Sequence, residues 1–107
     1  MIFLLDFGHY VKYVHVPDGY MDHLKERKIN DLVRFERDFF AWIDQHEEYI
    51  RYLDSIDGGK IKGHCYGAKD VLRYINEVIL ADSEEKAYFT SKAMLRKEKS
   101  GVLYFWK

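Results

Sequence analysis

The chain has 107 residues, of which 48% are hydrophobic and 33% charged, and its formal net charge at neutral pH is -1. This length and composition predict one globular domain, residues 1–107, and exclude a chain that stays disordered. The single cysteine excludes an internal disulfide. Together with an apolar start too short for a signal peptide and the lack of any membrane-length apolar run, it predicts a cytoplasmic protein with no membrane partner.

The N-terminal part predicts a hairpin. Residues 2–7 and 10–16 are rich in Phe, Leu, Val and Tyr, and the Gly-His pair between them fits a two-residue turn. A Pro-Asp-Gly turn follows. Residues 20–28 suit either a third strand or a short helix, and we favour the short helix because apolar residues recur there at helical spacing.

A long amphipathic helix is predicted over residues 29–56, and the rest of the chain is expected to pack on it. Asn30 or Asp31 is placed to cap its start, and the Gly58-Gly59 pair to end it. One face is formed by residues at steps of three and four along the chain. These residues are Ile29, Leu32, Glu36, Phe39, Ile43, His46, Ile50 and Leu53.

The second half of the chain predicts shorter elements. Residues 60–65 form a candidate strand or extended connection, and a clear apolar stripe predicts a helix over 68–80. Asp82, with Glu85 three residues later, matches a capping box, which predicts a further helical stretch to about residue 91.

The last elements predicted are two strands, 93–97 and 102–106, which form a hairpin across a Lys-Ser-Gly turn. The expected fold class is therefore α+β. A small antiparallel sheet, made of the N-terminal and C-terminal hairpins, packs against one long central helix and one or two shorter helices.

A thiol site is the first candidate for chemistry. Cys65 precedes a predicted helix, where the helix dipole lowers a thiol pKa. Thiol loops that bind phosphate carry an arginine six residues after the cysteine, but this chain has Val71 there. A buried or half-buried structural cysteine is therefore favoured. None of the five histidines has the spacing of a metal-ligand pair, so we expect no metal and no cofactor.

Aromatic residues are the more informative feature: the chain has nine tyrosines, seven phenylalanines and two tryptophans. Tyr, Trp and Arg dominate the energetics of protein interfaces. Two groups of them, one late in the long helix and one at the C-terminus, predict a binding surface or a dimer seam. The candidate binding residues are Trp42, Tyr49, Arg51, Tyr52, Tyr104 and Trp106.

Three functional hypotheses follow. The favoured one is a small intracellular protein-interaction module, such as an inhibitor, adaptor or immunity-type protein, which binds a protein partner or forms a homodimer through its aromatic surface. The second is a nucleic-acid binder that uses basic residues of the C-terminal hairpin beside exposed aromatic rings. These basic residues are Lys92, Arg96, Lys97 and Lys99. The third is a small enzyme that uses Cys65. The sequence contains no catalytic motif, which favours a protein that is not an enzyme.

Overall fold

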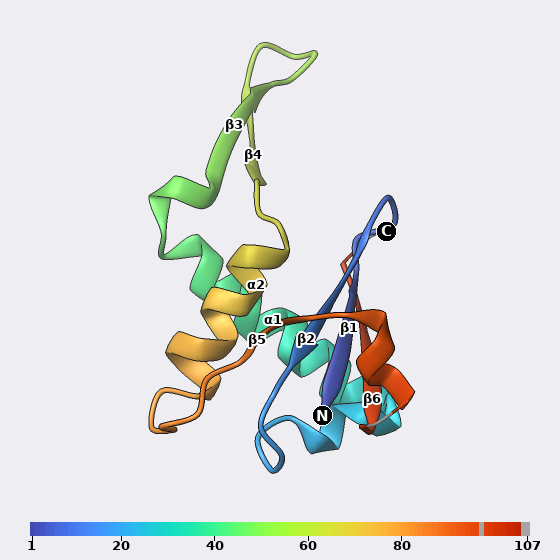
Figure 1. Ribbon diagram of the computed structural model, residues 1–107. Helices are drawn as coiled ribbons and strands as arrows, with labels where there is room; N and C mark the ends of the chain where they lie inside the picture. Colours follow the sequence, from blue (N-terminus) through green and yellow to red (C-terminus); the bar gives the residue numbers. More distant parts are fainter. Residues whose placement is uncertain (97, 106–107) are drawn as a thin grey trace.

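The computed structural model describes residues 1–96 and 98–105 as six strands and two α-helices, joined by short turns and 3₁₀ segments (Figure 1). A four-stranded sheet carries both helices on one face, and a separate two-stranded hairpin extends away from it. The elements are β1 (Ile2–Asp6), β2 (Val11–His15), α1 (Ile29–Asp44), β3 (Ile50–Asp54), β4 (Lys60–His64), α2 (Ala68–Tyr74), β5 (Tyr88–Thr90) and β6 (Ser100–Tyr104).

The larger sheet has the strand order β5-β2-β1-β6. Strand β1 pairs antiparallel with β2, and β2 pairs antiparallel with β5. Strand β6 pairs with β1 in the parallel sense, so the sheet is mixed rather than wholly antiparallel. The predicted α+β class, with a sheet packed against a long helix and a shorter one, is confirmed.

The N-terminal hairpin forms as predicted. Its turn is closed by a backbone hydrogen bond from Phe7 to the carbonyl of Tyr10 (3.0 Å) and by the carboxylate of Asp6, which accepts from the amide of Gly8 (2.8 Å). Gly8 has a φ of 85°, a conformation that favours glycine. The segment after β2 contains a 3₁₀ helix, Asp22–Glu26, so the choice of a short helix over a third strand is also confirmed.

Helix α1 is much shorter than predicted, and the prediction that it reaches residue 56 is wrong. It ends at Asp44, where His46 adopts an extended conformation and its Nδ1 donates to the carbonyl of Trp42 (2.7 Å). Residues 50–54 form β3 instead, because they pair with β4 along the whole strand. At its start, Lys28 holds the cap position without a side-chain hydrogen bond, so neither Asn30 nor Asp31 is the cap.

The second helix is confirmed. Helix α2 continues into a π-helical segment, Ile75–Ile79, and together they span nearly all of the predicted range 68–80. Two side chains hold its start: the Asp70 carboxylate accepts from the amide of Gly67 (2.8 Å), and the Tyr10 hydroxyl accepts from the amide of Ala68 (3.2 Å).

The C-terminal third differs from the prediction. No helix follows Asp82 among residues 83–91. The side chain of Asn76 holds this part of the chain extended, because its Oδ1 accepts from the amide of Ala87 (2.7 Å) and its Nδ2 donates to the Ala87 carbonyl (3.1 Å). Strand β5 follows directly.

The predicted C-terminal hairpin does not form. Residues 92–96 make a 3₁₀ helix, and β6 pairs with β1 rather than with a neighbouring segment of the chain. Lys97 and Trp106, which the prediction placed in that hairpin, lie outside the described residues.

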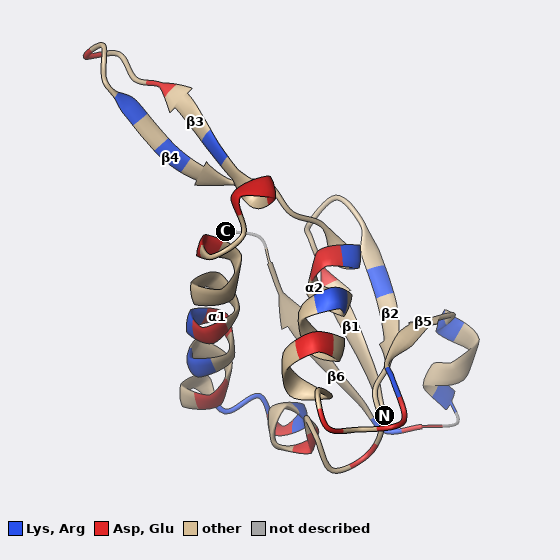
Figure 2. Ribbon diagram, turned by 90° about the vertical axis from the view of Figure 1, so that its left-hand side faces the viewer, with Lys and Arg blue, Asp and Glu red and all other residues tan. Residues whose placement is uncertain are grey.

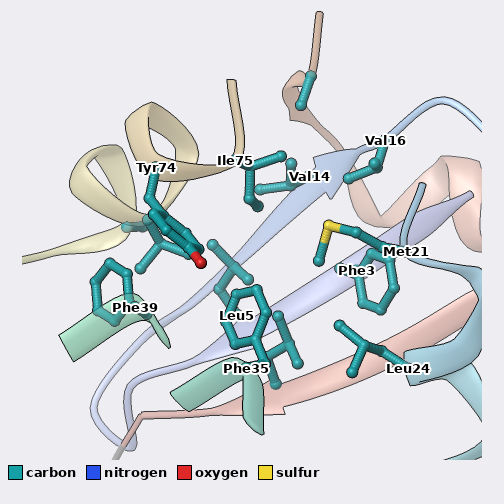
Figure 3. Close-up of a cluster of buried hydrophobic side chains, with 14 of the residues drawn as sticks. Phe3, Leu5, Val14, Val16, Met21, Leu24, Phe35, Phe39, Tyr74 and Ile75 are labelled. Carbon is teal, nitrogen blue, oxygen red and sulfur yellow. The ribbon is translucent and has the colours of Figure 1, made fainter. Parts of the chain in front are cut away.

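The hydrophobic core lies between the sheet and the two helices (Figure 3). Leu5 of the sheet packs against Phe35 of α1, Phe3 lies near Met21 and Leu24, and Val14 lies near Ile75, which directly follows α2. Burial of each such side chain contributes roughly 1.5–3 kcal/mol. Within residues 1–96 and 98–105, no helix has the length and apolar character needed to span a bilayer.

Candidate functional site

The β3–β4 hairpin, residues 50–64 and hereafter the arm, projects from the rest of the molecule (Figures 1 and 2). It forms a two-stranded sheet of its own. Its tip is closed by backbone hydrogen bonds from Ser55 to Gly59 (2.9 Å) and from Gly58 to Ser55 (3.1 Å). Gly58, with a φ of 81°, turns the chain at the tip and does not end a helix.

Large apolar side chains of the arm are exposed to solvent. Tyr52 is 65% exposed, Leu53 62%, Ile56 106% and Ile61 56%. Single exposed apolar side chains are normal on proteins, but four large ones on one 15-residue hairpin make the arm the candidate interaction surface. An isolated two-stranded hairpin is also marginally stable in water, so this arm gains from being covered.

The register of the arm assigns its side chains to two faces. Residues directly opposite one another share a face, so Leu53 with Ile61, and Arg51 with Gly63, form one side, hereafter the Leu53–Ile61 face. Tyr52 and its partner Lys62 lie on the other side.

The Tyr52–Lys62 side of the arm is tethered to the end of α1. The Asp44 carboxylate accepts from Nζ of Lys62 (2.8 Å) and from Nε2 of His64 (2.7 Å). These hydrogen bonds, that of Lys62 first, lower the pKa of Asp44 below its ordinary value. At the foot of the arm the amide of Cys65 donates to the carbonyl of Tyr49 (2.7 Å). The arm therefore has a defined position at its foot.

Arg73 of α2 fixes the segment that leads into the arm. Its guanidinium donates to the carboxylates of Glu77 and Glu48 (2.9 Å each) and to the Tyr49 hydroxyl (3.0 Å). It also lies 5.3 Å from the ring centroid of Trp42. The two carboxylates and the hydroxyl raise the pKa of Arg73 above its ordinary value. Its contacts thus join α1, α2 and the foot of the arm.

The predicted binding residues fall into separate places. Trp42 and Tyr49 come together at the foot of the arm, where Tyr49 is buried and Trp42 packs against the core. Arg51 and Tyr52 lie on the arm itself. Tyr104 lies on β6 of the larger sheet. Trp106 is outside the described residues.

Sequence reasoning missed Leu53, Ile56 and Ile61, the exposed apolar residues of the arm. Leu53 was assigned to the buried face of the predicted long helix. A usable signal was present: the Gly58-Gly59 pair stands between two short runs, 50–54 and 60–64, that contain Ile, Tyr and Leu, and a glycine-containing turn between such runs is typical of a hairpin.

A cavity of about 520 Å³ lies between α1 and the end of β6. Among the described residues, its lining is mostly aromatic and contains one charged side chain, that of Glu36. The lining residues are Leu32, Phe35, Glu36, Phe40, Tyr66, Leu103, Tyr104 and Phe105. Burial, with a smaller effect of Glu36, raises the pKa of Tyr66 to about 12.

We expect Tyr66 to ionise at a higher pH than an exposed tyrosine. Its folded pKa exceeds the unfolded value of about 10, so the folded state keeps this proton while the unfolded state loses it, and stability falls between about pH 10 and 12. Stopped-flow absorbance at alkaline pH should show late phenolate ionisation, to which Tyr49 and Tyr74 also contribute because burial raises the pKa of each, and Tyr66→Phe should reduce this late part by one group. Loss of an early ionisation near pH 10 in that variant, with the late part unchanged, would contradict the buried placement.

No protein-family model, no curated protein and no solved structure matches this chain. The geometry of the arm and its foot is therefore the guide to function. Cys65 is exposed at that foot, so the prediction of a buried or half-buried cysteine is wrong. Within residues 1–96 and 98–105, no group of three or more His, Cys, Asp or Glu side chains is placed to hold a metal ion.

Proposed function

We propose that this chain is a small intracellular protein-interaction module, of inhibitor, adaptor or immunity type, and that it binds its protein partner through the arm. The observation that carries the proposal is the exposure of Leu53, Ile56 and Ile61 on a hairpin that forms a separate sheet. The lone cysteine is compatible with a reducing compartment.

The arm is prepared for binding before it meets a partner. Its tip is closed by backbone hydrogen bonds, and its foot is tethered through Asp44 and the contacts of Arg73. A pre-organised segment loses less conformational entropy on binding than a flexible loop, so more of the gain from apolar burial appears as affinity. Both outer edges of its two strands also carry backbone groups that a partner strand can pair with.

The charges of the arm favour a protein over a nucleic acid. Figure 2 shows basic residues along both strands and acidic residues near the tip. Lys62 is paired with Asp44, and Lys60 is paired with Asp54. Phosphate binding needs basic groups whose charge is not already neutralised. The C-terminal hairpin on which the nucleic-acid hypothesis depended does not form.

The test is a comparison of three baits in extract from the source cells: wild type, an arm variant with Leu53→Ser and Ile61→Ser, and a control with Ile29→Ser and Val33→Ser. The control residues are exposed apolar side chains of α1, at 76% and 57% exposure. A protein recovered by wild type and control is purified, and its affinity is measured with each bait by calorimetry at low and high salt.

We expect the arm variant to weaken this affinity by about tenfold or more, because two central apolar side chains are lost. The control should bind within about twofold of wild type, and high salt should leave most of the affinity intact. Equal binding by the arm variant would overturn the proposal. So would recovery that nuclease treatment abolishes.

A further inference from the structure

A second cavity, of about 280 Å³, lies between the segment before α1, the first half of α1, and α2 with its π-helical extension. Its apolar lining includes Met21, Leu24 and Phe35, which are all buried. At the volume that a water molecule occupies in the liquid, about 30 Å³, this space holds roughly nine non-hydrogen atoms. It therefore suits a ligand smaller than a drug-sized molecule.

A tyrosine hydroxyl without a hydrogen-bond partner faces this cavity. Tyr74 lines the cavity, is only 4% exposed, and packs edge-on against Phe35 with the ring centroids 5.8 Å apart. Figure 3 shows its ring reaching from α2 with the hydroxyl oxygen directed toward Phe35. Among the described residues no donor or acceptor meets this hydroxyl. Buried hydroxyls normally have a partner, and the partner of this one has to come through the cavity.

The hydroxyl of Tyr74 is protonated at neutral pH. Burial, and after it the charge of Asp38, raises the pKa of Tyr74 above its ordinary value of about 10. The hydroxyl can therefore donate its proton to one ligand group and accept from another. The effect of Asp38 also shows that this carboxylate lies near the hydroxyl, although the two groups are not hydrogen-bonded.

Three charged side chains of α1 line the same cavity: Asp31, Arg34 and Asp38. Their spacing of three and four residues puts them on one side of the helix, with Arg34 between the two aspartates. Within residues 1–96 and 98–105, Asp31 and Arg34 form no ion pair, and Asp38 has a long contact to Arg37 (3.5 Å). The lining thus offers a guanidinium and carboxylates that a ligand can bind.

We infer that this cavity binds a small zwitterion, an α-amino acid with an apolar side chain. The ammonium group binds at Asp38 and the Tyr74 hydroxyl, the carboxylate binds at Arg34, and the side chain packs in the apolar part. A purely cationic ligand would leave the guanidinium unmatched, and a purely anionic one would face two carboxylates. A molecule with both charges meets each group with its opposite. The described lining residues all lie outside the arm, so this site does not depend on the proposed function.

Two-dimensional NMR of isotope-labelled protein tests this site by titration with L-leucine, L-isoleucine, L-methionine and L-phenylalanine. We expect saturable binding of at least one of them, with a Kd of about 1 mM or lower, as is ordinary for ligands of this size. The largest shifts should fall in residues 20–24, 31–38 and 74–79. Two analogues of the best ligand each lack one charge: its carboxamide, and the carboxylic acid without the amino group. Each should bind about tenfold more weakly or worse.

Three variants separate the contacts. Arg34→Gln should weaken binding of the amino acid by about tenfold, yet bind the carboxamide at least as well as wild type does, because the carboxamide carries no carboxylate. Asp38→Asn should weaken binding of both. Tyr74→Phe should weaken binding several-fold and leave the melting temperature without ligand unchanged, because the lost hydroxyl has no partner in the described chain. Arg96→Gln, on the 3₁₀ segment Lys92–Arg96, is the matched control and should bind as wild type does.

Every outcome decides the inference. Absence of saturable binding by all four amino acids overturns it. Equal or tighter binding of the carboxamide to the wild type also overturns it, and indicates instead a site for the amino end of a peptide. Unchanged affinity in both Arg34→Gln and Tyr74→Phe shows that the ligand binds elsewhere, which overturns it as well. None of these results changes the expected binding through the arm, so the two proposals fail separately.

Discussion

The Ile43→Asp variant is expected not to fold. Ile43 is completely buried in the last turn of α1 and belongs to the main core cluster. An aspartate there must either bury an unpaired charge or stay protonated, and it also removes the apolar contacts of the isoleucine. Such a change costs about 4 kcal/mol or more, against a total stability of roughly 5–15 kcal/mol for a domain. Circular dichroism should show the loss of the folded state.

Ile29→Asp is the matched control, because it makes the same chemical change at the other end of the same helix. Ile29 is 76% exposed, and an acid in the first turn interacts favourably with the helix dipole. We expect its free energy of unfolding to change by less than about 0.5 kcal/mol. If Ile43→Asp folds with an unchanged melting temperature, α1 buries a different face from the one described.

The contrast between these two positions shows what helical periodicity predicts and what it does not. The three-and-four spacing correctly assigned Phe39 and Ile43 to the core, yet it also included Ile29, which is exposed, and Leu53, which is on the arm. The spacing from Ile43 to Leu53 fits a helix by coincidence. Pairing with residues 60–64, a contact not encoded in local spacing, determines that the segment is a strand.

The candidate site was only partly predictable for the same reason. The abundance of aromatic residues indicated an interface, and Arg51 and Tyr52 do lie on the exposed arm. Trp42 and Tyr49 were predicted as binding residues, but Arg73, from another helix, draws them into a packed cluster. Composition shows that residues common in interfaces are abundant, but long-range packing determines which of them are exposed on the surface.

The C-terminal strand is the second case in which a non-local contact decides the structure. Lys99-Ser100-Gly101 has the composition of a turn, which predicts a hairpin turn there. In the structure Gly101 is inside β6, directly opposite Phe3 of β1. A Cβ on Gly101 would lie 2.7 Å from Cε1 of Phe3 and 3.3 Å from the Cα of Lys25. A glycine is needed at this position because the Phe3 ring fills the space that a side chain would occupy.

Gly101→Val is therefore expected to be strongly destabilising. Valine normally favours strands, so intrinsic propensity alone predicts a small gain. Phe3 is completely buried in the core and cannot move aside without disturbing its neighbours. Overpacking of this kind costs about 1–3 kcal/mol for a few added methyl groups. The valine would also press against the backbone of Lys25, so we expect a loss of stability at the upper end of that range. Thermal denaturation should show a midpoint lowered by roughly 5–15 °C.

Gly63→Val supplies the comparison at a strand glycine without this constraint, since the nearest atom to its Cβ is 3.8 Å away. We expect its melting temperature to stay within a few degrees of wild type. The double variant Phe3→Leu/Gly101→Ala should be less destabilised than the sum of its single changes, because the smaller side chain leaves room for the new methyl group. Strict additivity in that cycle would show that Gly101 is required for its backbone rather than for the space beside Phe3.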